Sequence, residues 1–354
     1  MTRKNFYLQV LILAVPIALQ NLLTALLNIF DQMMVGWLPG GIADSGLSAV
    51  LLANQIVFIF QIVIFAICNT VNIFIAQYTE NGNEHLIKNR AGFTFIIIAF
   101  VSIVFMLLCY LAPSFVIGLF NPSENYRKMA EDFLRLVALS FIPMGISVGI
   151  VFMLRAVKRL KAALAVNVCA VALNFLLNYT FMFGLMGVKP MGLLGAAYGT
   201  IFSRLAECIA MIAVLLILKN PLVGRIKEMF AFDGKFISQY FKMFFPILCN
   251  EIFWVLSTTV YLFVYDKLEN SAVVLASVNI AQSLDKIVSV VMIGVGSAIG
   301  VVLGNIIGRG NKKEVDLYAR ESLKFGFITG LAVALLTFGA AFVAPAVFKN
   351  VSAA

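Results

Sequence analysis

Long apolar runs dominate this chain, and each is long enough to cross a lipid bilayer as a single helix. A membrane-spanning helix needs roughly 18 to 20 mostly apolar residues. On that criterion the pattern predicts an all-α integral membrane protein with nine spans. They cover residues 8–37, 46–78, 91–119, 130–154, 161–186, 193–218, 237–265, 272–307 and 322–348.

The first apolar run carries one line of polar side chains after Pro16. The line is formed by Gln20, Asn21, Thr24, Asn28 and Asp31. At about 100° per residue, these side chains fall within roughly a quarter-turn of the helix surface. A helix that is apolar elsewhere turns such a line away from lipid, toward other helices or a water-filled cavity. Function is therefore expected where this line points.

Composition agrees with a membrane protein, since 62% of the 354 residues are hydrophobic and only 12% are charged. The net charge of +9 does not indicate nucleic-acid binding, because the Lys and Arg residues lie in short loops between apolar runs. The five cysteines lie singly within apolar runs, without the spacing of a metal site or a disulfide framework. No cofactor is predicted.

Basic residues are distributed unevenly between the two sets of loops. They concentrate at the N-terminus and in every second loop, around residues 88–90, 155–161, 219–235 and 309–324. Loops rich in Lys and Arg stay on the cytoplasmic side. The pattern therefore predicts a multi-pass protein of the cytoplasmic (inner) membrane with its N-terminus in the cytoplasm.

An internal repeat divides the chain. The motif at Pro16 recurs at Pro246, and residues 49–55 and 74–85 resemble residues 276–282 and 302–313. Halves that repeat in the same orientation predict two lobes related by an axis along the membrane normal, with a cavity between them. We expect a six-helix N-lobe (1–218), a cytoplasmic linker (219–236) and a partial, three-helix C-lobe (237–354). A complete repeat would require three more spans, so we expect a truncated chain.

These motifs, together with residues 173–184 and 195–204, resemble the multidrug and toxic compound extrusion (MATE) family. The resemblance implies a bundle of twelve helices in two six-helix lobes. It also implies export of organic cations and other amphipathic compounds in exchange for Na⁺ or H⁺. The chain departs from that pattern by ending after its ninth predicted helix.

The resemblance further implies a cation site in the N-lobe, formed by Asp31, Asn174, Asn178 and Thr200. Helical periodicity independently places both asparagines on one face, together with Asn167. Carboxylate, amide and hydroxyl oxygens suit Na⁺ or a proton relay. The family often has a second acid where this chain has Asn178, and the missing carboxylate gives weight to proton coupling.

Glu251 is the C-lobe counterpart of this polar line in the repeat. Coupling or substrate contacts are expected from Glu251, Asn21, Asn28, Trp254, Tyr261 and Asp285. Arg204 and Glu207 are spaced to form an ion pair. Glycines at every fourth residue from 296 to 308 predict close helix packing.

The leading hypothesis is a monomeric, cation-coupled antiporter for small amphipathic or cationic substrates. A lipid-linked oligosaccharide flippase is an alternative, but it would be expected to line its cavity with several Arg and Lys residues, which are few here. A truncated, non-transporting remnant is a third interpretation. An enzyme is not expected, because the sole histidine, His85, lies in a loop without a metal or nucleophile constellation.

Overall fold

A computed structural model describes residues 3–38, 42–120, 124–185, 187–217, 222–229, 232–266 and 271–347. Within them, the side chains of residues 3, 28–29, 42–44, 226–227, 258–259, 261–288 and 340–347 are not described. All regular elements of the described residues are helices, which confirms the predicted fold class. Eight of the described helical segments are long and apolar enough to cross a membrane.

The helices follow the order of the predicted spans. They are α1 (Arg3–Gly36), α2 (Ile42–Glu80), α3 (Glu84–Leu111), α4 (Pro113–Gly118), α5 (Glu124–Val137), α6 (Phe141–Ala156), α7 (Leu160–Phe183), α8 (Leu193–Ile217), α9 (Ile226–Met229), α10 (Gly234–Asp266), α11 (Ser271–Gly308) and α12 (Lys312–Val347). A 3₁₀ turn at Ala138–Ser140 joins α5 to α6, so these two helices form one span.

Two predicted boundaries differ from the structure. The span predicted at 91–119 ends as a helix at Leu111, because Pro113 cannot continue the hydrogen-bond ladder and instead begins α4. The span predicted at 130–154 begins earlier, at Glu124, because α5 carries polar residues on one face and was too polar to count as an apolar run.

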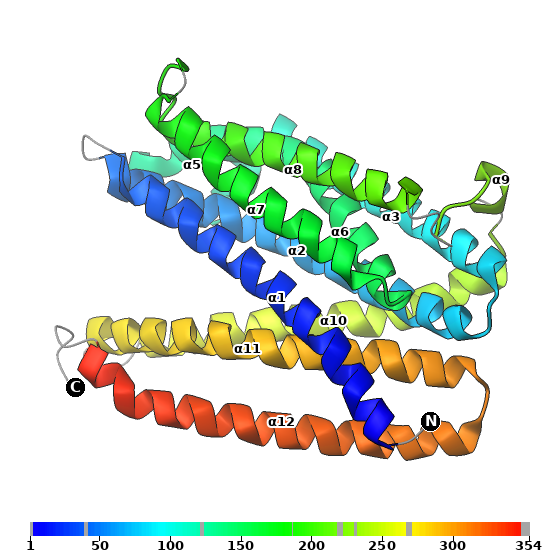
Figure 1. Ribbon diagram of the computed structural model, residues 1–354. Coiled ribbons are helices and arrows are strands. Elements are labelled where there is room, and N and C mark those ends of the chain that lie inside the picture. The colour runs from blue at the N-terminus through cyan, green and yellow to red at the C-terminus, as the bar shows by residue number, and fades with distance from the viewer. Residues whose placement is uncertain are drawn as a thin grey trace.

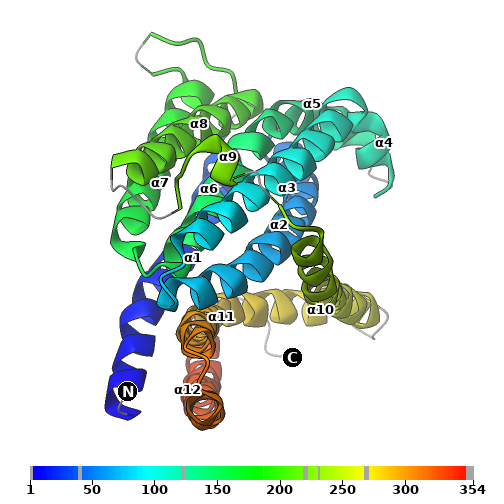
Figure 2. The same cartoon turned by 90° about the vertical axis from the view of Figure 1, so that its right-hand side faces the viewer.

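The helices form two groups, with α1 between them. In Figure 1, α2 to α8 lie together above α10, α11 and α12, and α1 crosses diagonally from one group to the other. Figure 2 shows the start of α1 beside α12. There Phe6 stacks on Tyr318, with 5.1 Å between ring centroids. Further along, α1 packs against α11 and α7.

Glycines allow α11 to approach α2 closely. A Cβ atom at Gly308 would lie 2.1 Å from the carbonyl oxygen of Gln77, and one at Gly304 would lie 2.9 Å from the Cβ atom of Ala76. At Gly296 and Gly300, none of the described atoms lies within 4 Å of such a Cβ. The predicted close packing is therefore confirmed for the second half of the glycine series and not for the first.

Two arginines that the sequence pattern assigned to loops are buried among the helices. Arg90 is 7% exposed, donates a 2.6 Å hydrogen bond to Asn89 and lies 3.5 Å from the centroid of the Phe236 ring. Arg155 is 5% exposed and lies within α6. Counting these two residues as loop charges was wrong, because both are buried within helices. Each lies at the edge of an apolar run, where the sequence pattern does not separate helix from loop. The cytoplasmic placement of the N-terminus stays a prediction.

Candidate functional site

A hydrogen bond joins the acid of α1 to α7. The Nδ2 atom of Asn178 donates to Asp31 Oδ1 at 2.6 Å and to Asn174 Oδ1 at 3.1 Å. The two asparagines are four residues apart and therefore project from the same face of α7. The structure thus brings together three of the four residues predicted to form the cation site.

The hydrogen-bond chain continues into α8. Asn174 Nδ2 donates to Ser203 Oγ at 2.9 Å, and the Ser203 hydroxyl donates to the backbone oxygen of Thr200 at 3.0 Å. Asn174, Asn178 and Ser203 are all buried. Because buried polar groups need partners, this chain fixes the orientation of each amide. Ser203 was not among the predicted site residues, although it shares the helix face of Thr200.

Gly199 allows α8 to reach this network. A Cβ atom there would lie 2.0 Å from Asn178 Oδ1, closer than atoms tolerate. That same oxygen is buried and has no hydrogen-bond donor among the described residues. A buried amide oxygen beside a carboxylate is the kind of ligand that a small, hard cation uses.

Asp31 and Thr200 line a common cavity of about 50 Å³ between α1, α2, α5 and α8. Asn54, Gln61 and Arg204 also line it. The space is sufficient for a small ion with some water, since one water molecule needs a cavity of only about 10 to 15 Å³ on this measure. Thr200, the fourth predicted residue, therefore belongs to the same site as Asp31.

Arg204 is a central residue of this region. It donates a 2.8 Å hydrogen bond to Glu207, which confirms the predicted ion pair. Arg204 lines the cavity of Asp31 and also two neighbouring cavities, of about 30 and 90 Å³, both of which Glu207 lines as well. The pair therefore forms part of the walls of these cavities, whereas the sequence spacing predicted only that the two residues form an ion pair.

Arg155 and Gln20 lie at the 90 Å³ cavity. The Nε and Nη2 atoms of Arg155 donate to Gln20 Oε1 at 3.0 and 2.7 Å. The guanidinium also lies over the ring of Phe152, 4.6 Å from its centroid. The position of Gln20 in the polar line of α1 was the one sequence signal for this contact, because nothing local indicates that Arg155 is buried.

Comparison with known proteins identifies the family. The family model described as MatE matches residues 16–180 and 246–350. The chain belongs to the MatE family. The two matched ranges begin at the two prolines where the internal repeat also begins.

Curated relatives and solved structures agree with this assignment. The MatE chain is 24% identical to "Probable multidrug resistance protein NorM" of Haemophilus ducreyi, over 92% of this chain and 69% of that protein. It is also 24% identical to the protein of the same name from Thermotoga maritima, over 92% and 68% of the two chains.

Its fold matches a crystal structure of a MATE mutant, with a TM-score of 0.83, 18% identity, and coverage of 96% of this chain and 73% of that one. It likewise matches the crystal structure of a eukaryotic MATE transporter, with a TM-score of 0.82, 15% identity, and coverage of 98% and 76%. The predicted multi-pass membrane fold is thereby confirmed.

Other predicted residues of this MatE chain lie apart from Asp31. Asn21 lines the 90 Å³ cavity beside Arg155. Glu251 and Trp254 lie on α10, where the Trp254 ring is 6.3 Å from that of Phe58. Among the described residues, Glu251 has no ion-pair or hydrogen-bond partner and does not line the three cavities. The side chains of Asn28, Tyr261 and Asp285 lie outside the described residues.

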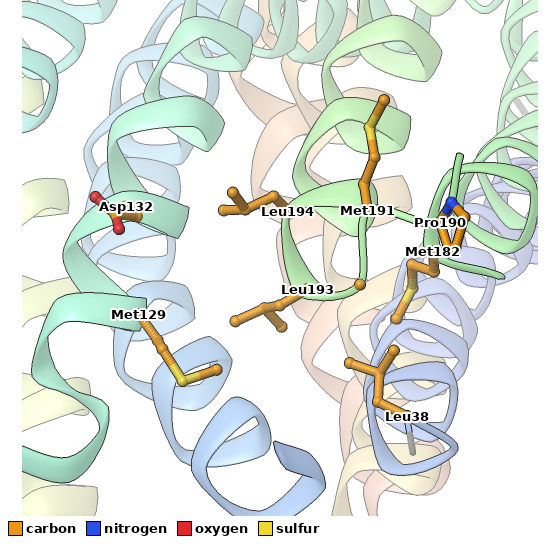
Figure 3. Close-up of a pocket in the computed structure, with 9 residues that line it drawn as sticks. Leu38, Met129, Asp132, Met182, Pro190, Met191, Leu193 and Leu194 are labelled. Carbon is orange, nitrogen blue, oxygen red and sulfur yellow. The ribbon is translucent and has the colours of Figure 1, made fainter. Parts of the chain in front are cut away.

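A fourth cavity, larger than these three, shares no residue with this site. It has a volume of about 380 Å³ and lies between α5 and the segment that leads into α8 (Figure 3). Asp132 is the charged residue of its wall, and the other lining side chains are apolar. They are Leu38, Met129, Met182, Pro190, Met191, Leu193 and Leu194. The size of a cavity therefore does not identify the one that contains Asp31 and Arg204.

Proposed function

We propose that this MatE chain is a cation-coupled exporter of small amphipathic and cationic compounds. As a MatE family member it is a transporter rather than an enzyme. The observation that carries the proposal is the Asp31 carboxylate, bonded to Asn178 at the edge of a cavity that Thr200 also lines. The names of the NorM relatives, which describe multidrug resistance proteins, support the same direction of transport.

Exchange follows from competition for Asp31. In the structure the Asn178 N–H donates to the carboxylate, so a cation that binds there must replace that hydrogen bond. Once the amide has turned, its oxygen and the carboxylate can both face Na⁺. A proton would bind to the carboxylate itself and weaken its attraction for a cationic substrate. Either ion releases substrate by occupying the charge that held it.

Cation binding also changes how two helices contact each other. The Asp31–Asn178 bond links α1 to α7, and α1 in turn packs against α11 of the second helix group. A change at this bond therefore reaches the boundary between the groups. We propose that residues 1–218 and 237–354 act as lobes that rock about this boundary, joined by residues 219–236, within one monomeric chain whose N-terminus is cytoplasmic.

The described walls of the three cavities give less support to a lipid-linked oligosaccharide flippase. A pyrophosphate needs several cationic groups. The charged residues of these walls are instead two arginines, Arg155 and Arg204, and two acids, Asp31 and Glu207. The chain spans about two-thirds of the length of the first two relatives. Export by this chain on its own is therefore part of the proposal, with a non-transporting partial protein as the opposing outcome.

Replacement of Asp31 tests the proposal. Asp31→Asn keeps the size and polarity of the side chain and removes its charge, so we expect loss of efflux driven by a Na⁺ or H⁺ gradient in proteoliposomes. Asp132→Asn is the matched control, because Asp132 lines the separate 380 Å³ cavity, and it should leave efflux near the wild-type rate. Undiminished efflux by Asp31→Asn would overturn the assignment of the site.

A further inference from the structure

The chain between the two helix groups is packed against α3. In both views α9 lies beside α3 (Figures 1 and 2). Gly92 allows this close approach, because a Cβ atom there would lie 2.2 Å from the backbone oxygen of Met229. Asn89, which is 1% exposed, donates through Nδ2 to the backbone oxygen of Glu228 at 3.4 Å. We use the name strap for α9, its described neighbours and the start of α10, that is, residues 222–229 and 232–240.

Aromatic side chains hold the end of the strap, at the start of α10. Phe236 is 2% exposed and Tyr240 is fully buried. The ring of Phe93, on α3, lies edge to face with both, at centroid distances of 5.1 and 5.0 Å. Phe74, on α2, packs on Phe236 in the same manner at 5.3 Å. If α10 separated from α2 and α3 at this end, these buried rings would become exposed and their mutual contacts would be lost.

Arg90 adds a buried positive charge to the same contact. Its guanidinium lies 3.5 Å from the centroid of the Phe236 ring, and its Nη1 atom donates to the neutral amide of Asn89 at 2.6 Å. Its Nε atom is buried and has no hydrogen-bond partner among the described residues. A cation over an aromatic face is held more strongly where water is excluded. Loss of Phe236 from this position would leave a buried charge poorly compensated, which is costly.

A second contact joins the two helix groups at the same end of the molecule, between α2 and α11. There Glu80 pairs with Arg309 at 3.2 Å, and the two side chains are 23% and 37% exposed. Ion pairs that are open to solvent contribute little and are screened by salt. The helices themselves meet at Gly304 and Gly308, which have no side chains to bury. Of the two contacts, the one between α2 and α11 is therefore the easier to separate.

We propose that the strap stays fixed on α3 throughout transport, held by Arg90 and Phe236, while the contact between α2 and α11 opens and closes. The strap then moves with the N-lobe and is not a free tether between two lobes. The second helix group rotates about the fixed contact at the start of α10. This inference rests on the proposed export function, and it specifies which of the two contacts between the groups changes during the cycle.

Two matched cysteine pairs test this inference, because each replaces one ion pair by a site for a cross-link. The Lys88 ammonium and the Glu228 carboxylate are 3.8 Å apart and join α3 to the strap. The Glu80 carboxylate and the Arg309 guanidinium are 3.2 Å apart and join α2 to α11. Each double variant is reconstituted in proteoliposomes and treated with a bifunctional thiol reagent that a reductant can cleave. Gradient-driven efflux is measured before cross-linking, after it, and after cleavage.

The two cross-links should have opposite effects. In the Lys88→Cys/Glu228→Cys variant, efflux should stay near its rate before cross-linking, because the strap does not leave α3. In the Glu80→Cys/Arg309→Cys variant, cross-linking should abolish efflux, and cleavage should restore it. The exposed cysteines of the chain, Cys169 and Cys249, are replaced in both variants. Loss of efflux on cross-linking the first pair, or full efflux with the second pair cross-linked, overturns the inference.

The proposed export function fails in a different way. If the protein exports nothing before cross-linking, that function is refuted, and amide hydrogen exchange in lipid nanodiscs still decides whether the strap is fixed. Exchange at residues 234–240 should be slower than at 304–308 in the wild type. Arg90→Gln should accelerate it about tenfold, as expected for loss of one buried cation–π contact.

Phe236→Leu is a second variant, which keeps an apolar side chain if Arg90→Gln fails to fold, and it should accelerate exchange at residues 234–240 in the same way. Arg320→Gln, at an exposed arginine of α12, is the control and should leave this exchange unchanged. Wild-type exchange in both Arg90→Gln and Phe236→Leu overturns the inference. Faster wild-type exchange at residues 234–240 than at 304–308 overturns it as well.

Discussion

Asn178 donates a 2.6 Å hydrogen bond to the carboxylate of Asp31, across a sequence separation of 147 residues. The bond fixes α1 against α7 at the point where the polar line of α1 meets the asparagine face of α7. It also places an amide N–H where a coupling ion would bind. Under the proposed function, the internal bond and the ion compete, and the strength of the bond helps to set the affinity for the ion.

Adding a second acid at this position should favour Na⁺. Asn178→Asp replaces the N–H donor by a carboxylate next to Asp31, and two carboxylates attract a hard cation more strongly than one. We expect the Na⁺ concentration for half-maximal binding to fall about tenfold, which corresponds to about 1.4 kcal/mol. Isothermal titration of the purified protein with Na⁺ measures this change.

Asn167→Asp is the matched control, since it adds the same charge about three turns away on α7, at the neighbouring cavities. It should change Na⁺ binding less. An equal gain in both variants would mean that the added charge acts generally and not through Asp31.

Gly199 should resist substitution because of its contact with Asn178. In Gly199→Ala the new methyl group would lie 2.0 Å from Asn178 Oδ1, so α8 must move away from α7. Overpacking of this kind costs about 1 to 3 kcal/mol, and we expect a lower Tm in thermal unfolding of the purified protein. At Gly36 no described atom lies within 4 Å of such a methyl group, so Gly36→Ala is the control. Equal Tm values for the two variants would contradict the close packing.

Glu80, at the end of α2, links that helix to the turn after α6 and to the end of α11. Its carboxylate accepts from Lys158 at 2.8 Å, in the turn between α6 and α7, and from Arg309 at 3.2 Å, just after α11. Glu80→Gln should loosen this junction by about 0.5 to 1 kcal/mol, because the pairs are partly exposed. We expect faster amide hydrogen exchange at residues 77–80 and 304–310, measured by mass spectrometry.

The control for Glu80 is Glu84→Gln. Glu84 lies nearby, at the start of α3, and pairs with Lys88 at 3.5 Å within its own helix. The Glu84→Gln variant should leave amide hydrogen exchange at residues 304–310 unchanged. High salt should accelerate exchange in the wild type toward the Glu80→Gln rate, since partly exposed ion pairs are screened. Identical exchange in all three proteins would show that the junction does not depend on Glu80.

Glu251 should act separately from Asp31. It lies on α10 and outside the cavities that Asp31 and Arg204 line, so we expect its charge to contribute little at Asp31. Glu251→Gln is expected to slow gradient-driven efflux several-fold with little change in equilibrium Na⁺ binding. Efflux from proteoliposomes and Na⁺ titration measure the two effects. A loss of Na⁺ binding as large as that in Asp31→Asn would place Glu251 at the same site.

Local patterns in the sequence predicted much of the site. The spacing of Asn174 and Asn178 places both on one face of α7, and the i, i+3 spacing of Arg204 and Glu207 predicts their ion pair, because helix geometry alone decides which neighbours share a face. Asp31 stood out as an acid within an apolar run. The resemblance to a known family grouped Asp31 with the two asparagines, which no local pattern could do.

The sequence by itself determined the class of the protein, the order of its helices and the polar face of α1, because the length and period of apolar runs are set by the bilayer and the helix. Only the tertiary structure decided that Arg155 is buried against Gln20, 135 residues away, and that Glu251 lies outside the cavities of Asp31. The physical reason is that burial and pairing depend on how distant helices pack, whereas the local sequence around Arg155 resembles that of any helix end beside a loop.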